Sequence, residues 1–96
     1  MQNLDSNLIS LLKDFINEND IQIDSEIDSN LRLLGSNSVF DSMELVQFIV
    51  EVEQFLDEEY GLEIELTSDK AMSRRTSPFI NIKALNNFIL EENNND

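Results

Sequence analysis

The feature that most constrains the fold is a long amphipathic segment between Asp41 and Gly61. Its apolar residues recur at the i, i+3, i+4 and i+7 spacing of one helical face, at Leu45, Phe48, Ile49, Val52, Phe55, Leu56 and Tyr60. Asp41 followed by Glu44 is typical of a capping box, in which each side chain accepts a hydrogen bond from the backbone N–H of the other residue. Gly61 suits the left-handed conformation that ends many helices. We therefore predict a helix from about Ser42 to Tyr60.

Three further segments complete the predicted secondary structure. The spacing of Leu4, Leu8, Leu11, Leu12, Phe15 and Ile16 predicts a helix from about Asn3 to Glu18. After Pro78, Asn81 is expected to cap a last helix with Ile82, Leu85, Phe88 and Ile89 facing inward. Ser68 to Ser73 can form a short helix. Residues 62–66 alternate between apolar and polar, and we expect a connector there because no partner strand is evident.

The long connection over residues 19–41 lacks helical periodicity. Aspartate, asparagine, serine and glycine punctuate it, and a loop longer than ~12–15 residues in a small domain needs anchors or a function. The expected anchors are its isoleucines and leucines, Ile21, Ile23, Ile27, Leu31, Leu33 and Leu34. The predicted fold is thus an all-α antiparallel four-helix bundle, with three long helices, one short helix and a long first loop. Residues 91–96 are expected to form a frayed polar tail.

Composition excludes several functions. The 96 residues include 20 acidic and 6 basic side chains and no histidine, which gives a formal net charge of −14. Nucleic acids and anionic membranes would repel such a chain. Without cysteine or histidine it lacks the usual nucleophiles, general bases and zinc ligands. An EF-hand loop starting at Asp20 fails because Gln22, Ser25 and Leu31 occupy ligand or glycine positions. We therefore expect no metal site. An enzyme built only from carboxylates remains open on composition alone, but the chain is short for enclosing a catalytic pocket, and we expect it not to be an enzyme.

The sequence is also expected to be soluble and cytoplasmic. It has no apolar run of the roughly 20 residues that span a bilayer, and no signal-peptide segment opens it. We expect a monomer that works through partner proteins.

The acidic residues are concentrated in one part of the chain. Between Leu33 and Asp69 the sequence has ten acids and neither lysine nor arginine. One interpretation is a solvated helix face. The other is a surface that steers basic partners, since a solvated face normally mixes both signs of charge.

A helical wheel of residues 42–60 places Met43 and Val50 opposite the core face. They lie one above the other beside Gln47, Gln54 and Glu51. Single exposed apolar residues are ordinary. Two aligned near the helix start favour a small contact patch for a partner.

Ser42 has two interpretations from its position alone. It can be a first-turn serine that competes for the helix cap. It can also carry an added phosphate group, because the free N–H groups and positive dipole end of a helix stabilise negative charge.

The tripeptide Asp41-Ser42-Met43, opening an acidic amphipathic helix after a long loop, resembles the Asp-Ser-Leu signature of acyl carrier proteins. The resemblance extends over about residues 4–90. It implies that Ser42 carries a 4′-phosphopantetheine arm preceded by the signature acid Asp41, and that cargo is held as a thioester on the thiol of the arm. It also implies that Met43 and Val50 contact partner enzymes. The acids that usually pair with partner arginines fall at Gln47, Glu53 and Gln54, and Glu44 and Glu51 can substitute for the two amides.

The resemblance implies an acyl-carrier-like domain over residues 1–90 followed by the tail at 91–96. Its expected function is to carry acyl groups, and its partners would be a phosphopantetheinyl transferase, an acyl-loading ligase and acyl or condensing transferases. The long helix before Gly61, and two arginines between Ala71 and Phe79, are similar to stand-alone carriers of dedicated lipid or secondary-metabolite pathways. The alternatives are an aminoacyl or peptidyl carrier, and an acidic helical interaction protein without a covalent group.

Overall fold

The computed structural model describes residues 3–23, 26–35, 38–66 and 77–94, and this part of the chain is all-helical, with three helices and no strand. The helices are α1 (Leu4–Glu18), α2 (Ser42–Tyr60) and α4 (Ile82–Asn94). The predicted all-α class is confirmed. The short helix predicted at Ser68 to Ser73, and the arginines at 74 and 75, lie outside the described residues.

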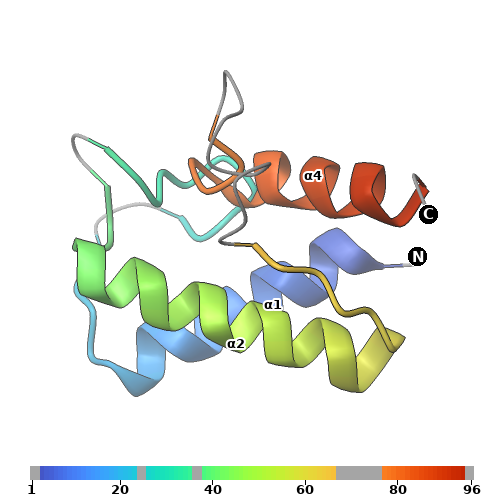
Figure 1. Cartoon of the computed structure of the whole chain (residues 1–96). Coiled ribbons are helices and arrows are strands. Elements are labelled where there is room, and N and C mark those ends of the chain that lie inside the picture. Colours follow the sequence, from blue (N-terminus) through green and yellow to red (C-terminus); the bar gives the residue numbers. More distant parts are fainter. Residues whose placement is uncertain (1–2, 24–25, 36–37, 67–76, 95–96) are drawn as a thin grey trace.

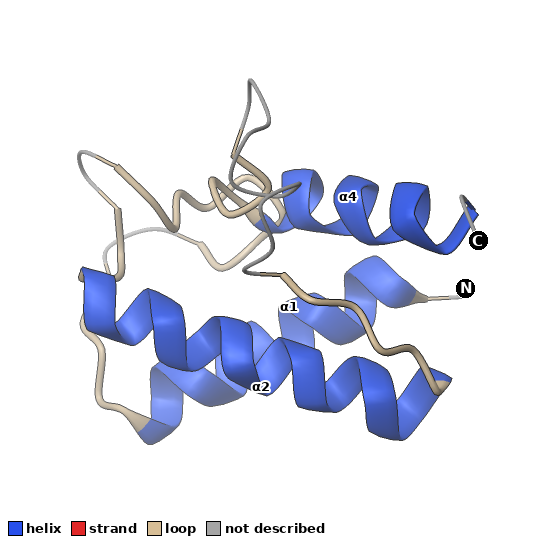
Figure 2. Ribbon diagram, in the orientation of Figure 1, coloured by secondary structure: helices blue, strands red, loops and turns tan. Residues whose placement is uncertain are grey.

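Helix α1 holds the fold together because it packs against both other helices. It runs in the direction opposite to α2 and α4, and much of the first loop lies near the first turns of α2 and α4 (Figures 1 and 2). The three helices bury the faces that their periodicity predicts. Their buried residues are Leu4, Leu8, Leu12, Phe15 and Ile16 of α1, Leu45, Phe48, Ile49, Val52 and Leu56 of α2, and Ile82, Leu85, Phe88 and Ile89 of α4.

Both ends of α2 have the predicted geometry. The Glu44 backbone N–H donates to Oδ1 of Asp41 at 2.8 Å, and the Asp41 N–H donates to Oε1 of Glu44 at 3.0 Å. Gly61 adopts a left-handed φ of 66°, and its N–H donates to the Asp57 carbonyl at 3.0 Å. The helix bounds and the capping box are therefore confirmed.

The ends of α1 and α4 add two points that the sequence analysis lacks. After α1, Asp20 takes a left-handed φ of 52°, and the Ile21 N–H closes the helix by donating to the Ile16 carbonyl. At the start of α4, the Asn81 side chain caps as predicted, accepting the Ala84 N–H at 2.8 Å. The helix then continues to Asn94 instead of fraying at residue 91. The helical periodicity of apolar residues stops at Leu90, but Glu91 and Glu92 are good helix formers, so the helix can extend beyond its apolar face.

The first loop is anchored by only some of the predicted residues. Leu31 and Leu33 are buried and the three isoleucines pack partly against the core, but Leu34 is 37% exposed, so its prediction as an anchor is wrong. The reason is local, because the chain turns at Gly35, where φ is 96°, and leaves Leu34 outside. Backbone bonds tie the loop to the start of α4: the Leu33 N–H donates to the Ile80 carbonyl at 2.8 Å, and the Lys83 N–H donates to the Ser29 carbonyl at 3.0 Å.

The segment after α2 is an extended connector, as predicted. Leu66 is buried, and its N–H donates to Oε2 of Glu53 at 2.9 Å, which ties the connector back to α2. At the end of α2, the Tyr60 ring contacts the Phe55 ring edge-on with centroids 5.9 Å apart, and the Tyr60 hydroxyl accepts a hydrogen bond from the Asn7 side chain at 2.7 Å.

None of the helices within the described ranges combines the length and apolar character needed to cross a bilayer.

Candidate functional site

The Asp41-Ser42 step is held in place by the residue before it. Phe40 is buried, and its ring centroid lies 5.3 Å from that of Phe15 and 5.6 Å from that of Phe48. Phe15 and Phe48 are themselves 5.6 Å apart, so the three rings form one cluster between α1, α2 and the loop. Phe40 directly precedes the cap and contacts Phe48, two turns into α2, and Phe15 of α1, so it joins the start of α2 to both helices. The cluster therefore fixes where α2 begins. The sequence analysis missed Phe40, although its place before the cap was a usable signal.

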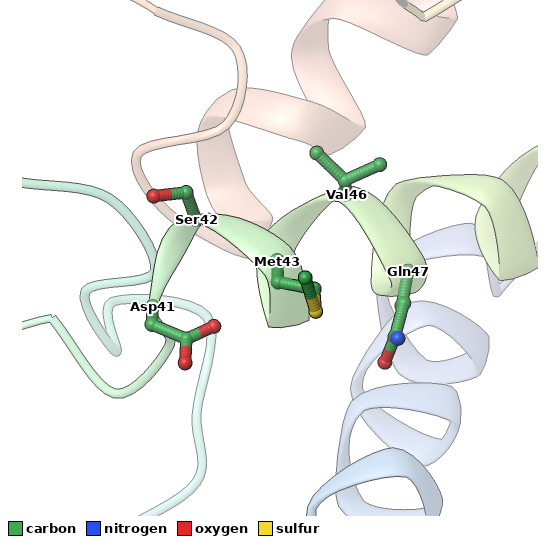
Figure 3. Close-up of a pocket in the computed structure, with 5 residues that line it drawn as sticks. All are labelled: Asp41, Ser42, Met43, Val46 and Gln47. Carbon is green, nitrogen blue, oxygen red and sulfur yellow. The ribbon is translucent and has the colours of Figure 1, made fainter.

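Ser42 is the first residue of α2 and is exposed. In Figure 3 its hydroxyl points away from the Asp41 carboxylate. That carboxylate accepts the Glu44 N–H through Oδ1, so Asp41 acts as the helix cap. An isolated serine hydroxyl is a weak nucleophile. The Ser42 hydroxyl is accessible from solvent at the first turn of α2.

An exposed apolar stripe follows Ser42 along α2. Met43 is 71% exposed and Val50 44% exposed, as the helical wheel predicts. Between them Val46 is 57% exposed, and the sequence analysis did not single it out. Its position three residues after Met43 and four before Val50 was the signal that could have found it. We call Met43, Val46 and Val50 the α2 patch. Its role as a partner contact stays a prediction.

Among the described residues, two hollows adjoin Ser42. The first is open and is lined by Asp41, Ser42, Met43, Val46 and Gln47 (Figure 3). The second, of about 420 Å³, lies between the start of α2 and the first loop, and its apolar lining includes Leu33, Leu34, Phe40, Leu45 and Val46. Its volume lies within the range of small-molecule pockets. A group attached to Ser42 can therefore lie against apolar surface on either side of Val46.

The predicted acidic and amide contacts separate into groups. Glu44 is engaged in the capping box, and Gln47 is exposed beside Met43. Glu53 and Gln54 line a different hollow, next to the connector at residues 62–65. Glu53 is also engaged, since it accepts the Leu66 N–H. The structure therefore does not bring Glu53 and Gln54 together with the residues around Ser42.

Glu51 lies on the other side of the α2 patch, toward α1. It is partly buried and lines a hollow with Val50 and with Glu18 of α1. Burial raises the pKa of the Glu51 carboxyl above its ordinary value of 4.5, and the negative charge of Glu18 raises it further. Glu18 has no role predicted from the sequence, because a hollow between two helices has no signature in the local sequence.

Within the described part of the chain, acidic side chains do not gather in groups of three that could hold a metal ion. Comparison with family models, with curated proteins and with solved structures finds no match to this chain.

Proposed function

We propose that this protein carries acyl groups as thioesters on a 4′-phosphopantetheine arm attached to Ser42. The observation that carries the proposal is the placement of Asp41-Ser42-Met43: the aspartate caps α2, the serine is exposed at the first helical position, and apolar side chains flank it on the surface. The arm would supply the thiol that a chain without cysteine lacks.

The residues present fit such an arm. A phosphodiester on Ser42 would lie at the N-terminus of a 19-residue helix, where free N–H groups and the helix dipole favour negative charge. The pantetheine and the first carbons of the cargo could lie in the hollows beside Val46. Met43, Val46 and Val50 would contact the enzymes that load and use the arm. These would be a phosphopantetheinyl transferase, an acyl-loading ligase and acyl or condensing transferases, and we expect the cytoplasm as the compartment.

A second function has separate support. The chain could be an acidic helical interaction protein without a covalent group, since the α2 patch is exposed in the chain with nothing attached to Ser42. An aminoacyl or peptidyl carrier would share the arm and differ only in cargo. The mass of the protein purified from its native host separates all three, because it reports both the arm and the cargo.

The direct test is incubation with coenzyme A and a broad-specificity phosphopantetheinyl transferase. We expect the wild type to gain the mass of one phosphopantetheine and Ser42→Ala to gain none. The matched control is Ser10→Ala, an exposed serine within α1, which should be modified like the wild type. A wild type that stays unmodified would contradict the carrier function and favour the interaction protein.

A further inference from the structure

The acidic residues expected to meet partner arginines are largely absent or engaged. Gln47 and Gln54 carry no charge, and Glu53 holds the Leu66 N–H at 2.9 Å. Glu44 is held in the capping box by the Asp41 N–H at 3.0 Å. Of the expected carboxylates, Glu51 has neither of these roles, so a cationic side chain that approaches the α2 patch would meet Glu51 together with carboxylates from another element.

Such carboxylates lie in a hollow of about 510 Å³ between the end of α1 and the middle of α2. Val46 and Val50 of the α2 patch form its apolar side, and Phe15 lies at its base from α1. Glu18 and Glu51 line it from opposite helices. The hollow is thus continuous with the α2 patch through the two valines.

The electrostatics of this hollow are unfavourable in the isolated protein. Glu18 lies in the last turn of α1, where the helix dipole is negative, and no basic residue lies in that turn. Glu51 is partly desolvated and is repelled by Glu18. A cation placed between the two carboxylates would relieve both effects, and its favourable contacts would add to those of the valines.

We propose that the hollow receives an arginine side chain of the phosphopantetheinyl transferase, so that the docking surface extends from α2 onto the end of α1. An arginine suits it because the guanidinium can donate to two carboxylates at once, while its aliphatic stem lies along Val46 and Val50. This inference rests on the proposed function, since the transferase is the partner that must reach Ser42.

The test compares two double variants that change the net charge equally. Glu18→Gln/Glu51→Gln neutralises the hollow, and Glu58→Gln/Glu59→Gln neutralises two exposed acids in the last turn of α2. With the broad-specificity transferase and coenzyme A, we expect the first to raise KM about fivefold at unchanged kcat, as for the loss of two ion pairs at an interface rim. The second should raise KM by less than about twofold, because it changes only long-range attraction.

Stability supplies an independent readout. Removing Glu18 and Glu51 removes a repulsion, so the thermal midpoint of the first variant should equal or exceed that of the wild type. Weaker docking by a protein that is no less stable is then not a folding defect.

Several results would overturn the inference. Equal KM changes in the two variants would mean that net charge alone attracts the transferase. An unchanged KM in Glu18→Gln/Glu51→Gln would mean that the hollow stays empty. Sedimentation showing that the wild type self-associates, and that this variant does not, would assign the hollow to a second copy of the chain. In each of these cases the wild type is still modified and the proposed function stands, whereas an unmodified wild type removes both.

Discussion

Replacing Phe40 with alanine tests whether the aromatic cluster fixes the start of α2. The Phe40 ring is only 5% exposed and contacts the rings of Phe15 and Phe48 at centroid distances of 5.3 and 5.6 Å. Truncation of a buried phenylalanine costs about 3–5 kcal/mol. This range already includes the loss of ring contacts, and because Phe40 has two of them, each worth about 0.5–1.5 kcal/mol beyond burial, we expect a value in its middle, about 4 kcal/mol. A domain of this size has about 5–15 kcal/mol of stability in total.

Urea unfolding followed by circular dichroism measures this cost. We expect a midpoint far below that of the wild type and a thermal midpoint lower by about 15–30 °C. Phe40→Leu keeps most of the apolar volume and should cost about 1–2 kcal/mol. The matched control is Val39→Ala, because Val39 is the adjacent residue and is only partly buried, so it should cost about 1 kcal/mol or less. If Phe40→Ala costs no more than Val39→Ala, the cluster does not anchor the loop, and our explanation for the position of Ser42 is wrong.

Four further predictions concern α2 and its surface. Met43→Ser should change the free energy of unfolding by no more than about 0.5 kcal/mol, whereas Leu56→Ala should cost about 2–5 kcal/mol because Leu56 is fully buried. Equal losses of stability in urea unfolding would contradict the predicted orientation of α2. Glu51→Gln should stabilise the fold at pH 7 by only a few tenths of a kcal/mol, because solvent screens the charge of this partly buried carboxylate. Because the folded-state pKa of Glu51 is raised, the folded state binds more protons than the unfolded state just above pH 4.5, so the charged carboxylate destabilises the fold as pH rises. The stability gained by Glu51→Gln should therefore vanish below pH 4.5. A stability gain that grows in acid would mean that the pKa of Glu51 is lowered by folding. Glu53→Ala should cost about 1–2 kcal/mol in thermal unfolding, because the Leu66 N–H loses its charged acceptor, and Glu53→Gln should recover part of this. Association with the transferase, followed by stopped flow, should slow steeply between low and physiological salt if the acids attract basic partners, and a salt-independent rate would mean that they only solvate the helix.

The sequence predicted those parts of the fold that depend on neighbours along the chain. The capping box at Asp41 and Glu44, the helix end at Gly61 and the inward faces of all three helices need only local spacing, and each is confirmed. The placement of Leu34 failed because an apolar residue next to a turn can face either way, and only the packed structure decides which.

The candidate site was predictable to the same extent. The exposure of Ser42, Met43 and Val50 follows from helical phase alone. The hollow that Glu51 shares with Glu18, and the engagement of Glu53 by the connector, depend on how distant segments meet in space. No periodicity within one helix encodes such relations between distant segments. Only the structure shows that the connector engages Glu53 and that Glu51 lies near Glu18.

Tyr60 gives the protein a built-in optical probe at one end of the fold. It is the only tyrosine, and the chain has no tryptophan, so the intrinsic emission of the protein comes from this ring. Tyr60 closes the end of α2, where its hydroxyl is held by Asn7 and its ring by Phe55. Emission should therefore change when α1 separates from α2.

The same ring is distant from Ser42. The two residues lie at opposite ends of a 19-residue helix, so 18 steps of 1.5 Å place them about 27 Å apart along its axis. Attachment of a group at Ser42 should leave the emission of Tyr60 unchanged as long as the helix stays intact. Fluorescence can thus follow unfolding in the same samples in which mass measurement follows modification, and the two measurements are independent of each other.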